Sequence, residues 1–248
     1  MKIVVEPAKM KQLLRQVLFY KGSPLLESAV ASVKPEGLAF LNLSLQVVGY
    51  YAQYPKRYFL EYECQSPEVI TFSRHILDKL NEAFKDSKQI TITTTEEKIF
   101  VRGERESFDE PLVASEKPEI PFKFVKNASG VVPEQFVPIV RIPIDISELD
   151  FPKAEEYRLK VTEDKKLLLE IVDIGRYTKE LQIAYNPNIE QILTPGASIL
   201  LDAEYFQHMI ANLSGEVVLS FDKAGWFALF QQAKDYHITY YLAEKVES

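Results

Sequence analysis

The sequence predicts an α+β protein made of two similar halves, each with antiparallel sheets and few helices. Three observations support this fold class: short β-branched and aromatic runs dominate the chain, few stretches have helical periodicity, and one strand–helix–strand unit occurs twice. The length of 248 residues allows two domains, each with its own core.

Composition and charge are those of a globular protein. Hydrophobic residues make up 46% of the chain, and no apolar run approaches the ~20 residues that span a bilayer. The stretch Met1–Pro7 does not have the pattern of a signal peptide, and the single Cys64 suits a reducing compartment. We therefore expect a cytoplasmic protein, or a nuclear one if the source is a eukaryote. With a net charge of −7, the protein could bind nucleic acid only through a local basic face.

The first expected element is an amphipathic helix over Lys9–Tyr20, with Pro7 at its entry. Its apolar stripe consists of Met10, Leu13, Leu14, Val17 and Leu18. A strand is expected next, over Ala39–Tyr51, because the stretch is rich in β-formers.

The repeated unit is a strand, a capped helix and a second strand. Its first copy consists of Ile70–Ser73, Arg74–Asp86 and Gln89–Thr93, with Ser73 as the helix N-cap. Its second copy consists of Ile199–Asp202, Ala203–Leu213 and Glu216–Ser220, with Asp202 as the N-cap and Gly215 closing the helix. The two copies lie about half the chain apart, as expected for two similar halves.

Most other elements are expected to be short strands. These are Lys98–Arg102, Tyr157–Val161, Leu167–Val172, Thr178–Ala184, Trp226–Gln231 and Tyr236–Leu242. The stretch Ser115–Val132 is rich in Pro, Gly, Ser and Asn, which is typical of a connector. We therefore predict domains at 1–115 and 133–248, joined by a connector at 116–132.

Four stretches in this order resemble sliding clamps of the proliferating-cell-nuclear-antigen type, archaeal and eukaryotic. They are Tyr54–Tyr62, Phe72–Thr93, Pro118–Phe124 and Tyr240–Val246. The resemblance implies two clamp domains that form one arc of a ring, with helices on the inner face and sheets outside. It is weak over 125–176, where the family has an amphipathic helix. Pro133, Pro138 and Pro143 forbid a long helix there, so only Ile146–Ala154 remains as a short candidate.

A clamp holds duplex DNA through diffuse positive charge directed at phosphates. The polar faces of the two first-half helices carry basic residues, which the resemblance places against DNA: Lys9, Lys11, Arg15, Arg74, Lys79, Lys85 and Lys88. The polar face of the last helix has none. Each of these lysines is also compatible with an ordinary solvated surface.

The resemblance also implies two protein-binding surfaces. A pocket for short apolar motifs of client proteins is expected at Leu45, Val47, Ile120 and Tyr241. Strand edges that pair subunits into a homo- or heterotrimer are expected at Ser107–Ala114 and Tyr177–Ala184, with Phe108, Leu112, Tyr177, Lys179 and Leu181 at the interface. Pro111 would remove one hydrogen-bond donor from the first edge.

No motif of an enzyme, metal site or cofactor site is present. His75, His208 and His237 are too scattered for metal ligation, and no glycine-rich phosphate loop occurs. The leading hypothesis is a replication clamp subunit that acts as a processivity factor and binds duplex DNA without sequence specificity. Its expected protein partners are a DNA polymerase, a clamp loader, and a nuclease or ligase. A checkpoint or repair clamp subunit is the first alternative, and a β-rich binding protein or enzyme unrelated to DNA is the second.

Overall fold

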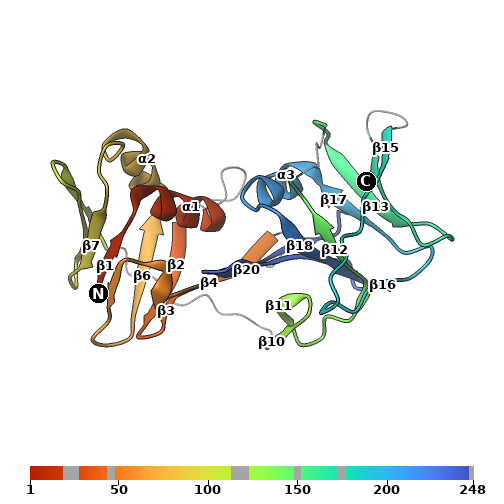
Figure 1. Ribbon diagram of the computed structural model, residues 1–248, viewed down its shortest axis with the longest axis horizontal. Helices are drawn as coiled ribbons and strands as arrows, with labels where there is room; N and C mark the ends of the chain where they lie inside the picture. The colour runs from red at the N-terminus through yellow and green to blue at the C-terminus, as the bar shows by residue number, and fades with distance from the viewer. Residues whose placement is uncertain (19–27, 44–47, 113–122, 148–151, 173–176, 246–248) are drawn as a thin grey trace. The chain divides into compact units, whose positions relative to one another are not determined.

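The computed structural model describes residues 1–18, 28–43, 48–112, 123–147, 152–172 and 177–245 (Figure 1). The chain divides into two compact units. The first contains Met1–Asn42, Tyr50–Glu119 and Ala233–His237, and the second contains Leu43–Gly49, Ile120–Gln232 and Ile238–Ser248. Among the described residues, no helix is long and apolar enough to cross a membrane.

The first unit contains two antiparallel sheets. One has the strand order β5-β1-β7-β8-β9, and its strands are Glu61–Glu63, Lys2–Val5, Ile90–Thr94, Lys98–Arg102 and Ser107–Pro111. The other has the order β4-β3-β2-β6, with strands Val48–Pro55, Gly37–Leu43, Ser28–Lys34 and Glu68–Ser73. A short 3-10 helix, η2 (Lys56–Tyr58), follows β4.

The second unit repeats this arrangement. Its first sheet has the order β16-β12-β18-β19-β20, with strands Ile192–Leu193, Pro138–Asp145, Glu216–Asp222, Trp226–Gln232 and His237–Ala243. Its second has the order β15-β14-β13-β17, with strands Tyr177–Glu180, Leu167–Ile171, Glu156–Val161 and Ser198–Asp202. Strand by strand in chain order, β12–β20 take the places of β1–β9. The internal repeat and the α+β class predicted from the sequence are therefore confirmed.

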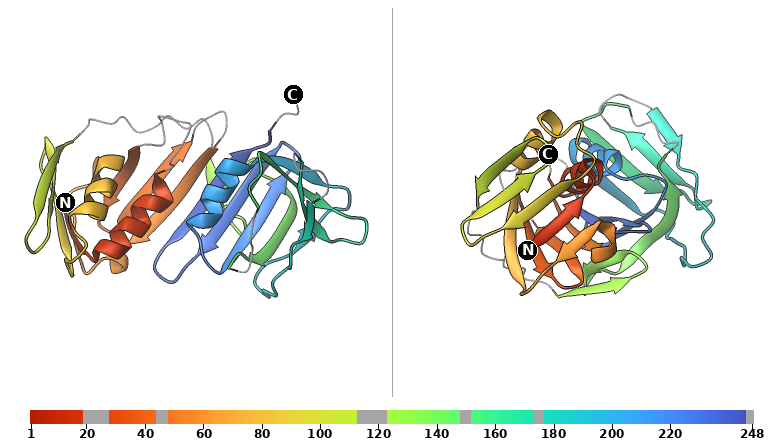
Figure 2. Two further views of the ribbon diagram at one scale, coloured as in Figure 1. Left: turned by 90° about the horizontal axis from the view of Figure 1, so that it is seen from above. Right: turned by 60° about the vertical axis from the view of Figure 1, so that its left-hand side comes forward.

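Three α-helices occur in the described residues: α1 (Pro7–Val17), α2 (Arg74–Glu82) and α3 (Ala203–Ala211). Both predicted caps are present: the Ser73 side chain accepts a hydrogen bond from the Ile76 N–H, and that of Asp202 accepts from Glu204 and Tyr205. In the first unit α1 and α2 lie side by side over the strands (Figures 1 and 2). In the second unit α3 stacks on the sheets through Phe206, whose ring lies 5.6 Å from those of Tyr157 and Phe227.

Several element boundaries were predicted wrongly. Ala39–Tyr51 is not one strand, because β3 ends at Leu43 and β4 begins at Val48. α2 ends at Glu82 instead of Asp86, and the strand predicted over Thr178–Ala184 ends at Glu180. The described residues of Ile146–Ala154 contain no helix, in line with the proline argument.

The predicted connector contains a β-hairpin that the sequence did not indicate. β10 (Phe124–Asn127) pairs with β11 (Gly130–Pro133) around a turn in which the Ser129 N–H donates to the Asn127 side chain. The prolines were expected to exclude a central strand from this stretch. The β10–β11 hairpin agrees with that expectation, because it forms a separate two-stranded sheet. The boundaries at 115 and 133 stay a prediction.

Candidate nucleic-acid interface

Helix α1 presents basic residues opposite its buried face. Met10, Leu13, Leu14 and Val17 are fully buried, so the other side of the helix faces solvent. Lys11 and Arg15 lie on that side, one helical turn apart; Arg15 is exposed and Lys11 is half-buried.

Lys85 joins these two residues from the segment after α2. The buried Phe84 anchors this segment, and Lys85 beside it is exposed. Burial, and then the positive charges of Arg15 and Lys85, lower the pKa of the Lys11 ammonium. The positive charges of Arg15 and Lys85 therefore both act on Lys11, as expected for cations near one another on α1 and the segment packed beside it. We call Lys11, Arg15 and Lys85 the cationic cluster.

The cationic cluster is not neutralised from within. Among the described residues, none of its three side chains forms an ion pair with a carboxylate. Cations held close together without counter-charges attract a polyanion, and the repulsion between them is relieved when phosphates bind.

The other four predicted DNA-binding residues are less available. Arg74 lies 3.7 Å from Asp78 and Lys79 lies 3.6 Å from Glu82, both on α2. Lys9 lies 5.7 Å from the centre of the Tyr58 ring, in a cation–π contact. Lys88 is exposed and takes no part in the ion pairs of α2 or the cation–π contact of Lys9.

Helix α3 of the second unit has a neutral to acidic polar side. Glu204 is exposed, and Gln207 donates to the Pro152 carbonyl at 3.2 Å. Burial lowers the pKa of His208 to about 4, so its ring is neutral at pH 7. The Asn212 amide donates to the His208 carbonyl at 2.8 Å. Of the three described α-helices, only the two of the first unit therefore carry lysine or arginine on their polar sides.

The two predicted interface strands both lie at open ends of their sheets. β9 ends the sheet of the first unit, and β15 ends the smaller sheet of the second. The Phe108 ring packs on Phe84 at 5.8 Å, while the Leu112 N–H donates to the Glu97 carbonyl at 2.6 Å. Tyr177 is exposed, Lys179 is half-buried and Leu181 is only 2% exposed. Leu181 can therefore stabilise the edge strand from within, but it has little exposed surface for contact with another subunit. The role of these residues between subunits stays a prediction.

The predicted client pocket is only partly described, because Leu45, Val47 and Ile120 lie outside the described residues. Tyr241 is 2% exposed, and its hydroxyl donates to the Val131 carbonyl of the β10–β11 hairpin. Its ring lies 5.8 Å from that of Phe124. Tyr241 therefore packs inside the second unit, and its role in a client pocket stays a prediction.

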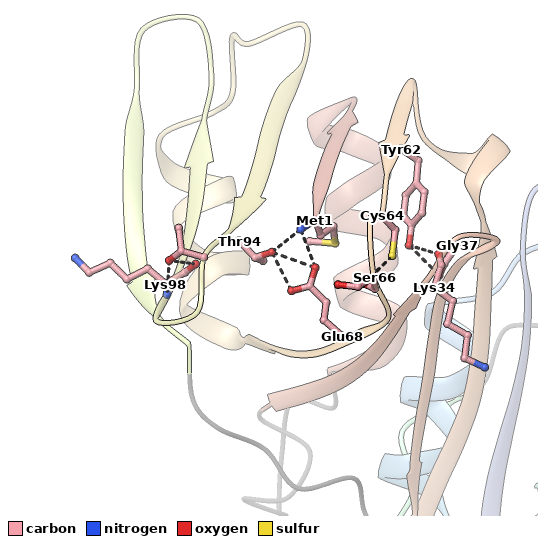
Figure 3. A network of polar contacts seen from close by, with 10 residues as sticks. Met1, Lys34, Gly37, Tyr62, Cys64, Ser66, Glu68, Thr94 and Lys98 are labelled. Atoms are coloured by element: carbon pink, nitrogen blue, oxygen red, sulfur yellow. Dashed lines mark hydrogen bonds and ion pairs between the residues drawn. The ribbon is translucent and has the colours of Figure 1, made fainter.

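One polar pocket of about 440 Å³ lies in the first unit. Its lining includes Met1, Lys2, Glu63, Glu68 and Thr94. The Met1 ammonium lies 2.7 Å from the Glu68 carboxylate and donates to Thr94 at 2.9 Å, as Figure 3 shows. The same view contains Cys64, whose thiol donates to the Ser66 carbonyl, and burial raises the pKa of that thiol. The Met1 ammonium, Glu68 and Thr94 thus pair with one another within the pocket.

No cluster of three or more metal-ligating side chains occurs in the part of the chain that the structure describes. Glu110 was not among the predicted site residues; it lies on β9 and accepts a hydrogen bond from the Ser73 hydroxyl at 2.5 Å. The alternation of the strand, which places residue 110 on the same side as Phe108, was the signal that could have revealed it.

The fold was compared with those of known proteins. No family model matches the chain, and no curated protein matches it. Solved structures do match. The PCNA2–PCNA3 complex from Sulfolobus tokodaii superposes with a TM-score of 0.75 at 17% identity and covers 100% of both chains. PCNA of A. fulgidus, bound to the C-terminal region of FEN-1, gives 0.73 at 11% identity, covering 100% of this chain and 99% of the other. PCNA from Thermococcus kodakaraensis gives 0.73 at 16% identity, with 98% and 99% covered.

The fold class that these units define is that of a DNA sliding clamp. Within that class, the chain has the fold of proliferating cell nuclear antigen over its whole length, at 11–17% sequence identity to these structures.

Proposed function

We propose that the chain is one subunit of a ring-shaped clamp that encircles duplex DNA and tethers a polymerase and other replication or repair enzymes. The observation that carries the proposal is the cationic cluster, which two separate elements build on an acidic chain of clamp fold. Its partners would be duplex DNA, other clamp subunits, a clamp loader, and client enzymes with short apolar motifs. It would act as a scaffold and not as an enzyme.

The chemistry of the cluster suits sliding better than sequence recognition. Lysine and arginine side chains at the end of flexible stems attract phosphates of any sequence and exchange between them with little cost. A protein that must move along DNA needs contacts of this weak, screened kind.

The test replaces the cluster and measures DNA retention. Lys11, Arg15 and Lys85 are changed together to Ala, and binding to circular duplex DNA is measured over a range of salt concentrations. We expect weaker retention and a salt slope that is flatter by up to about 3, because each lost phosphate contact removes close to one released counterion.

A matched control changes three exposed cations of the second unit, Lys126, Lys160 and Lys223, to Ala. The net charge falls equally, so a loss of retention in both variants would show only a general charge effect. If the cluster variant retains DNA as well as wild type does, the proposed DNA-binding surface is wrong.

A further inference from the structure

Arg141 is a largely buried cation of the second unit. It lies on β12, where it pairs with Ile192 of β16 on one side and with Ser220 of β18 on the other. Its side chain is only 11% exposed, and burial lowers the pKa of its guanidinium. An arginine nevertheless stays charged at pH 7. A charge withdrawn so far from water normally has hydrogen-bonded counter-charges around it.

One nitrogen of the guanidinium is used inside the chain. The Arg141 Nε–H donates to the Ser129 hydroxyl oxygen at 3.0 Å, and the Ser220 hydroxyl donates to the same oxygen at 3.0 Å. Ser129 is fully buried in the turn of the β10–β11 hairpin. These bonds hold the guanidinium against the hairpin, and they leave its two terminal nitrogens to other partners.

The terminal nitrogens of Arg141 have one weak counter-charge in the described chain. Nη1 lies 4.0 Å from the Glu190 carboxylate, which is too far for a hydrogen bond. The Glu190 side chain is 84% exposed, so water competes for its charge. A guanidinium can donate five hydrogen bonds, and among the described residues that of Arg141 donates one. The chain itself therefore compensates this charge only in part.

The segment that carries Glu190 also carries Tyr185. It begins beside β12, where the Ala184 N–H donates to the Pro143 carbonyl at 2.8 Å, and it returns to β12 where β16 pairs with Arg141. Tyr185 is 86% exposed, although its ring is large and mostly apolar. Arginine and tyrosine are enriched among the residues that dominate protein–protein binding. Both lie near the same edge of β12, which points to a protein ligand and not to a free ion.

We infer that Arg141 binds a carboxylate of an acidic segment in a partner protein, and that Glu190 occupies this place until the partner binds. A carboxylate in the right orientation accepts two parallel hydrogen bonds from a guanidinium, whereas Glu190 at 4.0 Å accepts none. The incoming group replaces Glu190 charge for charge. The inference goes beyond the proposed function, because it assigns a second site on a different unit from the cationic cluster.

The setting of Arg141 suits a carboxylate better than the phosphates of DNA. Sliding contacts need exposed cations on flexible stems, whereas Arg141 is fixed by Ser129 and is 11% exposed. The exposed Glu190 beside it also repels a polyanion. A guanidinium held in one orientation instead matches a single planar carboxylate.

The test measures how a labelled pentaglutamate peptide binds to the full chain at low salt, by fluorescence anisotropy. Arg141→Gln should weaken binding by about tenfold, because it removes a charge-assisted pair of hydrogen bonds. Glu190→Gln should strengthen binding by about threefold, because it removes the internal competitor. The matched controls, Lys160→Gln and Glu163→Gln, make the same charge changes at exposed positions of the second unit and should leave binding unchanged.

NMR of the Arg141 Nε–H resonance shows whether the peptide binds at this place. Arg141→Lys identifies the resonance by its absence, and the resonance should shift as the peptide is added to wild type. Arg141→Gln also removes the bond to Ser129, so a weaker affinity alone could come from a loosened hairpin. Glu190→Gln leaves that bond in place and therefore tests the inference independently.

Equal affinity of wild type and Glu190→Gln, or an Arg141 resonance that does not move, overturns the inference. The same holds if Arg141→Gln lowers DNA retention as much as Arg15→Ala does, because the ligand is then a phosphate. Peptide binding that persists when Lys11, Arg15 and Lys85 are changed to Ala separates this site from the cationic cluster. Failure of the proposed DNA-binding surface would then leave the inference standing.

Discussion

The two units share one strand order but use their helices differently. In the first unit, α1 and the segment after α2 bring three unpaired cations together. In the second, α3 presents Glu204, an amide and a neutral His208. The repeated fold therefore fixes where a helix lies, while the residues on its polar side decide what it can bind. A duplicated architecture does not imply a duplicated binding surface.

This difference predicts that α3 is mainly structural, and Phe206→Ala tests that most directly. The Phe206 ring is fully buried between Tyr157 and Phe227. Its removal should lower the free energy of unfolding of the second unit by about 3–5 kcal/mol, because it leaves a cavity in the core. Denaturant unfolding followed by circular dichroism measures this loss.

The matched change in the first unit is Arg15→Ala, which should leave stability nearly unchanged and weaken DNA retention. A Phe206→Ala protein that stays folded yet loses DNA to the same degree as Arg15→Ala would contradict the division of roles between the two units.

The neutral His208 gives the second unit a pH dependence. Burial lowers its pKa to about 4, below the ~6.5 of an unfolded histidine. Between these values the unfolded chain binds a proton that the folded chain excludes, so stability is full above about pH 6.5 and falls as the pH drops towards 4. The contribution of this one group is up to about 1.4 kcal/mol per pH unit in that window.

Unfolding midpoints of wild type and His208→Gln between pH 7 and 4 measure this effect, and the variant should have the flatter profile. His75→Gln, at an exposed position on α2, is the control. Parallel profiles for wild type and His208→Gln would show that His208 is not excluded from water as the structure has it.

Local patterns predicted the repeat, and distant contacts decided what was missed. Ser73 and Asp202 were found as caps because an N-cap depends on the next few residues. The β10–β11 hairpin was missed because distant side chains hold it: Thr239 accepts from the Val131 N–H at 3.0 Å, and Tyr241 donates to the Val131 carbonyl. The proline content of the connector, on which its prediction depended, does not indicate that Thr239 and Tyr241 bind it.

The candidate site shows the same division. Helical spacing placed Lys11 and Arg15 on the polar face of the first helix, and the resemblance to sliding clamps assigned that face to DNA. Their closeness to Lys85 depends on how α1 packs beside α2. The ion pair that makes Arg74 less available to DNA could have been predicted. Asp78 lies four residues after Arg74, and oppositely charged residues at this spacing pair on the surface of a helix.

The smallest predicted effect compares the two caps of the repeat. The Asp202 carboxylate accepts from the Glu204 and Tyr205 N–H groups at 3.0 and 3.2 Å, while the Ser73 hydroxyl accepts from the Ile76 N–H at 3.4 Å. A charged acceptor with two short bonds at the positive end of a helix stabilises more than a hydroxyl with one long bond. Asp202→Ala should therefore cost about 1–2 kcal/mol, and Ser73→Ala about 0.5–1 kcal/mol through the cap itself.

Ser73→Ala has a second consequence, because Ser73 also donates to Glu110. In the monomer this change leaves the Glu110 carboxylate with less support, which adds to the cap effect. The difference between the two cap variants in thermal unfolding should therefore be smaller than the cap hydrogen bonds alone predict. A difference as large as the two caps alone predict would show that the Ser73–Glu110 hydrogen bond adds little to stability.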